Sequence, residues 1–455
     1  MNFLHGQKLI AQKEFGRALD VFLNLKKNDN NDVILFYLGL IYFELNNFNK
    51  SIYYYNKFLT KKPNSIIALY NFAFVKQSIG EIEDAKDIYL RLIKLDENKI
   101  RPYYGLYTLN PNYLSGSDFE RIFFIKNNFK HTLFEKGIIN FILSKKEKKN
   151  KKYSKEIEYL KISHSLIFNS KKVYNLQSQF YYNQIIGQFY NKLKFSKNDI
   201  NTSINKKIIP IFIIGLPRSG STLIDAILSS CSANVRSLGE CHVFNMSIFE
   251  QVESKIYEKD FNLKNFDFEI DLIQLNESIL RRYDQFNFTN EKKNLIIIDK
   301  SLENFFNIEF ILNIFPKAKF IHTFRNPLDS IISIYQSMLA ELSWTHSIED
   351  ILIYLDNYFK VLRYYKNKYP QVIMDVDLEK FTENSENISK KIYKFCNLNW
   401  NRKVLNFHER KDLFSKTLSF MQVRNKISKY DNTKYKPYLH LLKNYKEKYK
   451  WINFD

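Results

Sequence analysis

The residues from Gly215 to Thr222 have the types and spacing of a loop that holds a phosphate-like anion. An apolar run at 211–214 predicts a buried strand before the loop, and a helix is predicted to begin near Ser221. Such a turn directs several backbone N–H groups and the positive end of a helix dipole at one place. The sequence therefore predicts an anion-binding loop between a strand and a helix.

This loop has the outline of a nucleotide-binding P-loop, G-x-x-x-x-G-K-[ST], with one change. Ser221 occupies the lysine position, and Arg218 stands two residues before Gly220. A kinase or ATPase uses that lysine on the β- and γ-phosphates. A loop with an arginine and two hydroxyl side chains still binds an anionic group, but it is poorly equipped for ordinary ATP chemistry.

Charged residues follow several predicted strands in the same half of the chain. Strands are predicted at 211–214, 295–298, 318–324 and 372–376, with helices between them. This alternation indicates an α/β domain with a central parallel sheet, in which ligands sit beyond the carboxyl ends of the strands. Arg218, Lys300 and Arg325 all lie just past strand ends, so we expect them to converge.

A second phosphate contact is suggested by the segment after Arg325. Asn326 is predicted to cap a helix that begins at Pro327, which puts Ser333 about two turns into that helix. Arg325 and Ser333 would then reach the same phosphate group. On spacing alone, a surface arginine and a serine bonded to its own helix backbone are the better explanation.

The N-terminal part of the chain repeats itself. Small residues 33 and 34 positions apart are each followed four positions later by an aromatic residue: Ala18 and Phe22, Ser51 and Tyr55, Ala85 and Tyr89. This pattern resembles the tetratricopeptide repeat, a helix–turn–helix unit whose arrays usually bind proteins. The repeats carry no chemistry of their own.

Three regions are predicted: tetratricopeptide-like repeats at 1–99, a helical extension and linker at 100–205, and a catalytic domain at 206–455. Helices are expected at 134–143 and 177–195, and a linker at 196–203. The lysine-rich run 145–152 is predicted to be a solvated loop, with a docking site for an acidic partner as the alternative.

Composition limits the choice of partners. The chain has 455 residues and a net charge of +21, from 69 basic and 48 acidic residues, but its lysines are scattered and accompany abundant Asn, Ile, Tyr and Phe. We therefore expect an anionic substrate and no nucleic acid. Three cysteines without metal-ligand spacing, no signal-like segment and no long apolar run predict a cytoplasmic protein without a bound metal or a membrane partner.

The ordered set of motifs resembles the sulfotransferase family. It comprises Pro217–Thr222, Leu238-Gly239-Glu240, Asp299-Lys300, and Phe324-Arg325-Asn326-Pro327 followed after five residues by Ser333. The resemblance is to bacterial sulfotransferases with N-terminal tetratricopeptide repeats and, more distantly, to tyrosylprotein sulfotransferases. Each motif is weak alone, whereas the set is specific and covers nearly the whole chain.

This resemblance implies 3′-phosphoadenosine 5′-phosphosulfate (PAPS) as cosubstrate. The implied contacts are Arg218, Ser219, Gly220, Ser221 and Thr222 for the 5′-phosphosulfate, Arg325 and Ser333 for the 3′-phosphate, Ser419 near the transferring group, and Lys434 closing over the nucleotide phosphate. Where relatives have a tyrosine that opens a Tyr-Glu-Asp-Leu-like motif, this chain has Leu378. A contact on the adenine or phosphate side is therefore missing or replaced.

Sulfuryl transfer requires neutralised charge and a group that accepts a proton. Arg218 and Lys300 are the candidates for stabilising charge on the leaving phosphate. Glu240 is the candidate base, because it matches the catalytic glutamate of the tyrosylprotein branch, and His242 is the alternative. The acceptor would be a hydroxyl of a protein tyrosine, a sugar or a small molecule.

Two other functions remain open from the sequence. A P-loop kinase would use Asp299 at the end of its strand as a magnesium ligand, although the missing lysine argues against it. The other alternative is a repeat-based scaffold, whose transferase domain binds nucleotide but transfers no group.

Overall fold

A computed structural model describes residues 2–28, 31–195, 208–231, 234–258, 261–286, 295–410 and 412–453. The chain forms two compact units. The first comprises Met1–Phe129, Leu280–Glu291 and Arg410–Met421, and the second comprises Lys130–Ile279, Lys292–Glu409 and Gln422–Asp455. The predicted linker at 196–203 lies outside the described residues.

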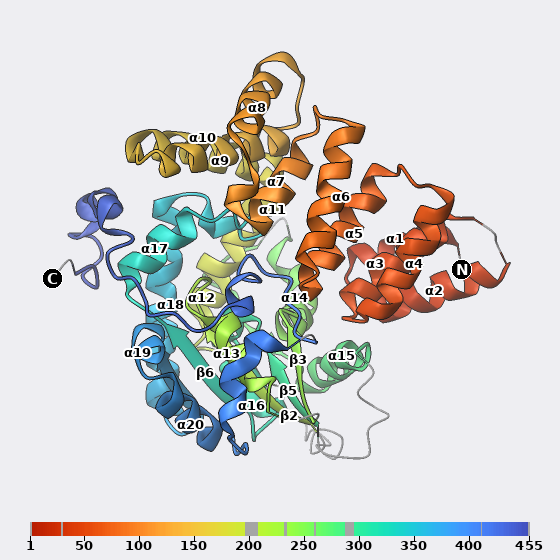
Figure 1. Cartoon of the computed structure of the whole chain (residues 1–455). Helices are drawn as coiled ribbons and strands as arrows, with labels where there is room; N and C mark the ends of the chain where they lie inside the picture. The colour runs from red at the N-terminus through yellow and green to blue at the C-terminus, as the bar shows by residue number, and fades with distance from the viewer. Residues whose placement is uncertain are drawn as a thin grey trace. The chain divides into compact units, whose positions relative to one another are not determined.

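The first unit is helical, and its helices follow one another in the red-to-orange part of Figure 1. They are α1 Phe3–Ala11, α2 Phe15–Asn28, α3 Val33–Glu44, α4 Phe48–Lys61, α5 Ile66–Ile79, α6 Ile82–Leu95, α7 Ile100–Leu109 and α8 Gly116–Asn128, with a 3₁₀ turn at Pro111–Tyr113. The helical character predicted for residues 1–99 is confirmed.

Aromatic side chains pack against glycines in this unit. Phe22, Tyr55 and Tyr89 are buried, and so are the small residues four positions before each of them. A Cβ added to Gly39 of α3 would meet the Tyr55 ring at 3.0 Å, and one added to Gly105 of α7 would meet Tyr89 Cε1 at 2.4 Å. The aromatic residue of each predicted repeat therefore fills the gap between two helices, and a glycine on the facing helix makes room for its ring.

The second unit begins with helices that precede the strands of its sheet in the sequence. They are α9 Leu133–Lys149, α10 Tyr153–Ser170, α11 Lys172–Phe180, a π-helical segment Tyr181–Ile186, and α12 Gly187–Phe189. Thr132 and Glu135 form a capping box that starts α9, since each side chain accepts from the other's backbone N–H. Residues 130–195, which the sequence analysis assigned to a helical extension, belong to the same compact unit as the sheet.

A five-stranded parallel sheet forms the centre of the second unit (Figure 1). Its order is β3 Val235–Gly239, β5 Leu295–Asp299, β2 Ile208–Gly215, β6 Lys319–Phe324 and β7 Ile373–Asp377. A separate pair joins β1 Lys194–Phe195 to β4 Glu269–Ile270. Because all five strands run the same way, their carboxyl ends meet at one edge of the sheet, as the alternating pattern predicted.

Helices connect and cover these strands. They are α13 Ser221–Leu228, α14 Val243–Ile256, α15 Leu272–Asp284, α16 Ile308–Ile314, α17 Pro327–Tyr335, α18 Ile348–Lys368, α19 Leu378–Glu383 and α20 Ser385–Phe395; 3₁₀ segments lie at Leu302–Phe306, Ser343–Thr345, Arg402–Glu409, Gln422–Arg424 and Lys436–Tyr445. The predicted start of α17 is confirmed, since Asn326 Oδ1 accepts from Leu328 N at 2.8 Å and Pro327 is the first helical residue.

Two local predictions are wrong, and one strand was not predicted. Residues 145–149 of the lysine-rich run are not in a loop, because α9 continues to Lys149 and buries Lys145. The helix expected at 177–195 changes to π-helical winding at Tyr181 and ends at Phe189. Strand β3 is too short and too polar to show an apolar pattern in the sequence.

Within the described residues, no helix combines the length and the apolar character needed to cross a bilayer.

The glycine–aromatic packing predicts the effect of one added methyl group. We expect Gly105→Ala to destabilise the chain by about 1–3 kcal/mol, because the new Cβ meets the buried Tyr89 ring at 2.4 Å. Gly116→Ala is the matched control, since it starts α8 and nothing lies within 4 Å of its added Cβ. Urea denaturation measures both. Equal midpoints for the two variants would contradict the packing argument.

Candidate active site

The predicted anion loop lies between β2 and α13, and its backbone is left-handed at two positions. Arg218 has a φ of 68° and Gly220 a φ of 87°. A Cβ on Gly215 would lie 2.3 Å from Thr323 O of the neighbouring strand, and one on Gly220 would lie 2.5 Å from Leu378 Cδ1. Both glycines are required by close approach, and Leu378 therefore packs directly against the loop.

Within the loop, the Ser219 hydroxyl is engaged by the protein itself. It donates to Leu216 O at 2.7 Å and shares a hydrogen bond of 2.8 Å with Thr323 Oγ1 of β6. Ser219 would therefore offer an anion its backbone N–H rather than its hydroxyl. Ser221 and Thr222 form the buried first turn of α13, where the helix dipole favours negative charge.

Arg218 and Arg325 follow the adjacent strands β2 and β6, whose ends are paired at Gly215 and Thr323. Burial lowers the pKa of Arg218, and the nearby charge of Arg325 lowers it further, while Tyr435 acts in the opposite direction. Burial raises the pKa of Tyr435. The charges of Arg325 and Lys434, together with hydrogen bonds with Ser333 and Arg325, outweigh burial and lower this pKa overall. The loop, the end of β6 and α17 thus face one electropositive region.

Arg325 is held by aromatic residues and a backbone carbonyl. Its guanidinium carbon lies 5.6 Å from the Tyr430 ring centroid and 5.2 Å from that of Tyr435. Nη1 donates to Tyr430 Oη at 3.2 Å and Nη2 to Asp329 O at 3.1 Å, while Tyr430 Oη donates to Asp329 Oδ2 at 2.6 Å. Nε is buried and has no hydrogen-bond partner among the described residues, so it is available to donate to a ligand oxygen.

Lys300 and Glu240 form an ion pair at the ends of β5 and β3. Lys300 Nζ donates to Glu240 Oε1 at 2.7 Å, and the lysine side chain is 2% exposed whereas the glutamate is 40% exposed. Burial opposes the charge on Lys300, but Glu240, Asp225 and Asp299 outweigh it and raise its pKa. Lys300 therefore remains a buried cation at neutral pH, with a carboxylate that reaches solvent.

The alternative base, His242, has a carboxylate partner that the sequence analysis missed. His242 Nδ1 lies 2.5 Å from Glu303 Oε1, and the same oxygen accepts from Asn245 Nδ2. Although Glu303 is buried, the histidine and its hydrogen bonds lower the pKa of this carboxyl. Asp299, by contrast, is buried and accepts from Cys241 Sγ and Ser301 N. For Glu303, the only signal in the sequence is that an acidic residue stands three positions after Lys300.

The remaining predicted residues fall in two places. Ser333 is buried in α17 beside Tyr435, and Lys434 immediately precedes that tyrosine. Ser419 belongs to the segment Arg410–Met421 of the first unit, where its N–H donates to Thr417 Oγ1 at 3.3 Å. Its role near the transferring group stays a prediction. In the described ranges, no three His, Cys, Asp or Glu side chains gather as metal ligands would.

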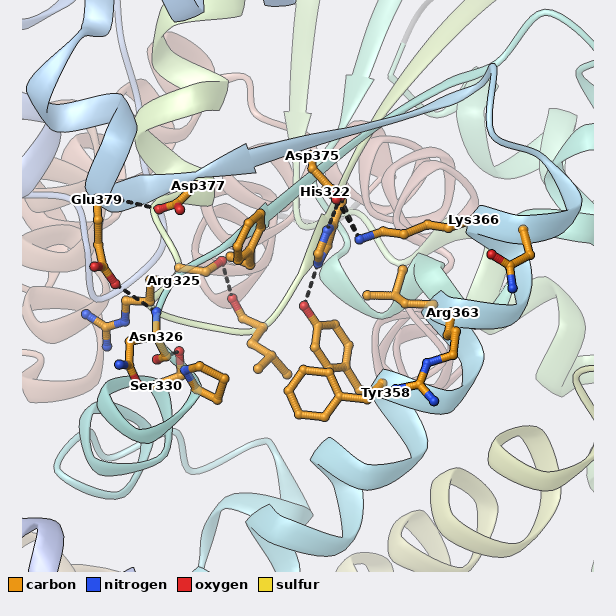
Figure 2. Close-up of a pocket in the computed structure, with 17 residues that line it drawn as sticks. His322, Arg325, Asn326, Ser330, Tyr358, Arg363, Lys366, Asp375, Asp377 and Glu379 are labelled. Atoms are coloured by element: carbon orange, nitrogen blue, oxygen red, sulfur yellow. Dashed lines mark hydrogen bonds and ion pairs between the residues drawn. The ribbon is translucent and has the colours of Figure 1, made fainter. Parts of the chain in front are cut away.

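A cavity of about 660 Å³ adjoins this region between β6, β7 and α18, and two predicted residues, Ser219 and Arg325, contribute to its lining. Figure 2 shows His322 between Asp375 and Tyr358, with Lys366 reaching Asp375. His322 Nδ1 lies 2.7 Å from Asp375 Oδ1 and Nε2 lies 2.5 Å from Tyr358 Oη. Burial lowers the pKa of His322, so the ring is neutral and braces the edge of the sheet.

Residues 210–402 match the model of the sulfotransferase family. This segment contains the loop, the Lys300–Glu240 pair and the end of β6. The match thus agrees with the resemblance carried by the sequence motifs.

Two curated relatives are uncharacterised. A protein of Aquifex aeolicus (strain VF5) is 25% identical over 384 residues, which are 83% of this chain and 49% of the relative. The Ycf37 protein of Guillardia theta is 33% identical over 63 residues, or 14% of this chain and 35% of the relative. The chain spans about half the length of the first relative and about a third of the second.

Solved sulfotransferase structures show low overall similarity. The enzyme from Alicyclobacillus acidocaldarius is 13% identical with a TM-score of 0.30, covering 43% of this chain and 87% of that one. A sulfotransferase from Mycobacterium tuberculosis H37Rv is 11% identical with a TM-score of 0.33, covering 68% of this chain and 97% of that one.

The loop geometry predicts the effect of a single methyl group on anion binding. We expect Gly220→Ala to weaken binding of 3′-phosphoadenosine 5′-phosphate (PAP) at least about tenfold, because alanine opposes the positive φ and its Cβ meets Leu378. Calorimetry measures the affinity, and Gly116→Ala again serves as the control. Undiminished binding by Gly220→Ala would show that this loop conformation is not what holds the nucleotide.

Proposed function

We propose that the chain transfers a sulfuryl group from PAPS to an acceptor hydroxyl and releases PAP. The observation that carries the proposal is the placement of Arg218, in the anion loop after β2, and Arg325, at the end of β6, beyond adjacent strands that the Ser219–Thr323 hydrogen bond ties together. Two guanidinium groups that share one region suit a ligand with two separate anionic ends. The family match of residues 210–402 supports the same chemistry.

In this proposal the loop and α13 hold the 5′-phosphosulfate, and Arg325 with Ser333 holds the 3′-phosphate. Backbone N–H groups at 218–222 and the N-terminus of α13 supply oriented dipoles. Lys434 lies next to the same region through Tyr435 and would close over the phosphate. Leu378 contributes an apolar contact with the loop where relatives have a tyrosine.

Transfer would proceed by in-line displacement at sulfur. The acceptor oxygen forms a bond to sulfur as the bond from sulfur to the bridging phosphate oxygen breaks, and the electron pair remains on the leaving PAP. Arg218 and Lys300 neutralise the charge that builds on the bridging and equatorial oxygens. The raised pKa of Lys300 keeps its ammonium protonated for this role.

The acceptor proton has two candidate destinations. Glu240 is partly exposed and paired with Lys300, so a base at this position would act beside the group that stabilises the leaving phosphate. His242 is oriented by Glu303 through Nδ1, which leaves Nε2 as the basic nitrogen. We propose Glu240 as the base because it lies next to Lys300.

The surroundings of Asp299 argue against the kinase alternative. A magnesium ligand must present its carboxylate to the nucleotide, whereas Asp299 is buried and its oxygens accept from Cys241 and Ser301. The inactive-scaffold alternative differs only in the absence of transfer. A cytoplasmic location, tetratricopeptide identity for the first unit and its use to recruit a protein acceptor are part of the proposal.

Nucleotide preference tests the proposal directly. We expect tight calorimetric binding of PAP and weak binding of ATP, with Arg218→Ala and Arg325→Ala each lowering PAP affinity at least about tenfold, since each removes a charged contact worth roughly 1.5–3 kcal/mol. Arg402→Ala is the control, because that side chain is 83% exposed. Magnesium-dependent preference for ATP would revive the kinase reading instead.

Substitution of the candidate bases tests the chemical step. We expect Glu240→Gln to reduce kcat by about 10²–10⁴-fold with PAP binding retained, because glutamine keeps a hydrogen bond to Lys300 but accepts no proton. Transfer from labelled PAPS to a panel of hydroxyl acceptors supplies the assay. His242→Gln is compared in parallel. A loss confined to His242→Gln would move the base to histidine, and PAP binding with no transfer by the unaltered chain would favour the scaffold.

A further inference from the structure

The lysine-rich run forms the last turns of α9, and two of its lysines point into the protein. Lys145 is 9% exposed and its Nζ donates to Gln336 O at 2.6 Å. Lys148 Nζ donates to Gln336 Oε1, also at 2.6 Å. Lys149, next in the chain, is exposed. One face of this basic run is thus bound to Gln336, the residue that follows α17.

Gln336 links these lysines to the proposed phosphate site. It follows Ser333 by three residues and caps the carboxyl end of α17 in helical conformation, so the two lie on the same side of that helix. Ser333 in turn hydrogen-bonds with Tyr435, whose ring lies over Arg325. The charges of Lys434 and Tyr435 both act on the pKa of Lys148, the first lowering it and the second raising it. The end of α9 therefore borders the region that contains Arg325, Ser333 and Lys434.

The positive charge in this region is only partly compensated. Burial lowers the pKa of Lys145 to about 7, and the charges of Lys148 and Lys434 contribute. Burial also lowers the pKa of Lys148, with Lys434 again contributing. Glu156 of α10 offsets part of this charge, but its Oε2 already accepts from Tyr438 Oη at 2.5 Å. Buried cations that repel one another gain most from an anion placed among them.

We propose that Lys148 and Lys145 of α9 complete the subsite for the donor 3′-phosphate that Arg325 and Ser333 begin. Lys148 borders the phosphate, and Lys145 holds Gln336 behind it and adds charge. This inference rests on the proposed function, because it presupposes a donor with a phosphate on its 3′-hydroxyl. Its consequence is that α9, which lies outside the family-matched segment 210–402, contributes to donor specificity.

Two nucleotides that differ only in the 3′-phosphate test the inference. Calorimetry on the full chain compares PAP with adenosine 5′-monophosphate, the latter measured by competition. We expect Lys148→Gln to lower PAP affinity at least about tenfold, the value of one charge-assisted contact, and to leave the monophosphate affinity unchanged. Lys149→Gln, the same change on the exposed neighbour, should alter neither. Circular dichroism verifies that each variant is folded.

The outcomes separate the two levels of the proposal. If the unaltered chain prefers PAP but Lys148→Gln weakens both nucleotides equally, or neither, the role of α9 is refuted while the proposed function stands. If the unaltered chain does not prefer PAP over the monophosphate, the proposed function fails and the inference fails with it.

Proton uptake gives a second readout for Lys145. An anion raises the pKa of a neighbouring ammonium, so at pH 8 the largely neutral Lys145 should gain a proton when PAP binds. Heats measured in buffers of different ionisation enthalpy reveal this uptake, which should vanish in Lys145→Met.

PAP affinity of the unaltered chain should fall as pH rises above about 7, and less so in Lys145→Met. The titratable groups facing Lys145 are Lys148 of α9, Glu156 and His164 of α10, and Lys434. Equal uptake with and without Lys145 would refute its participation.

Discussion

Positive charge gathered beyond the carboxyl ends of parallel strands is the constraint around which the second unit is built. β2, β5 and β6 place Arg218, Lys300 and Arg325 at one edge of the sheet. Each charge is accommodated differently: Lys300 by a carboxylate, Arg325 by two tyrosine rings and a carbonyl, and Arg218 at the expense of a lowered pKa. A fold that gathers these cations at one edge of its sheet is poised to accept a polyanion.

Much of this arrangement could be predicted because its determinants are local. Apolar runs predict β2, β5, β6 and β7, the Asn326-Pro327 pair predicts the start of α17, and the small-residue and aromatic pairs predict the helix contacts of the first unit. Strand ends then place the charged residues, since parallel strands finish at the same edge. The convergence of Arg218 and Arg325 follows from topology alone.

What escaped prediction depends on contacts between distant segments. The lysine-rich run reads as solvated, because nothing in its neighbours shows that Lys145 meets Gln336, 191 residues away. Tyr430 and Tyr435 are two of 31 tyrosines, so their packing over Arg325 leaves no mark in the sequence. Glu303 became a partner of His242 only when β3 and β5 were paired.

The hydrogen bond between Ser219 and Thr323 ties the anion loop to the strand that ends in Arg325. Gly215 is paired with Thr323 in the sheet register, so Arg218 and Arg325 follow adjacent strands of the same sheet. The sheet therefore sets the spacing between the two arginines. A ligand whose two anionic groups are too close together contacts one arginine and leaves the other in water. The site therefore selects its ligand by the distance between the anionic groups more than by total charge.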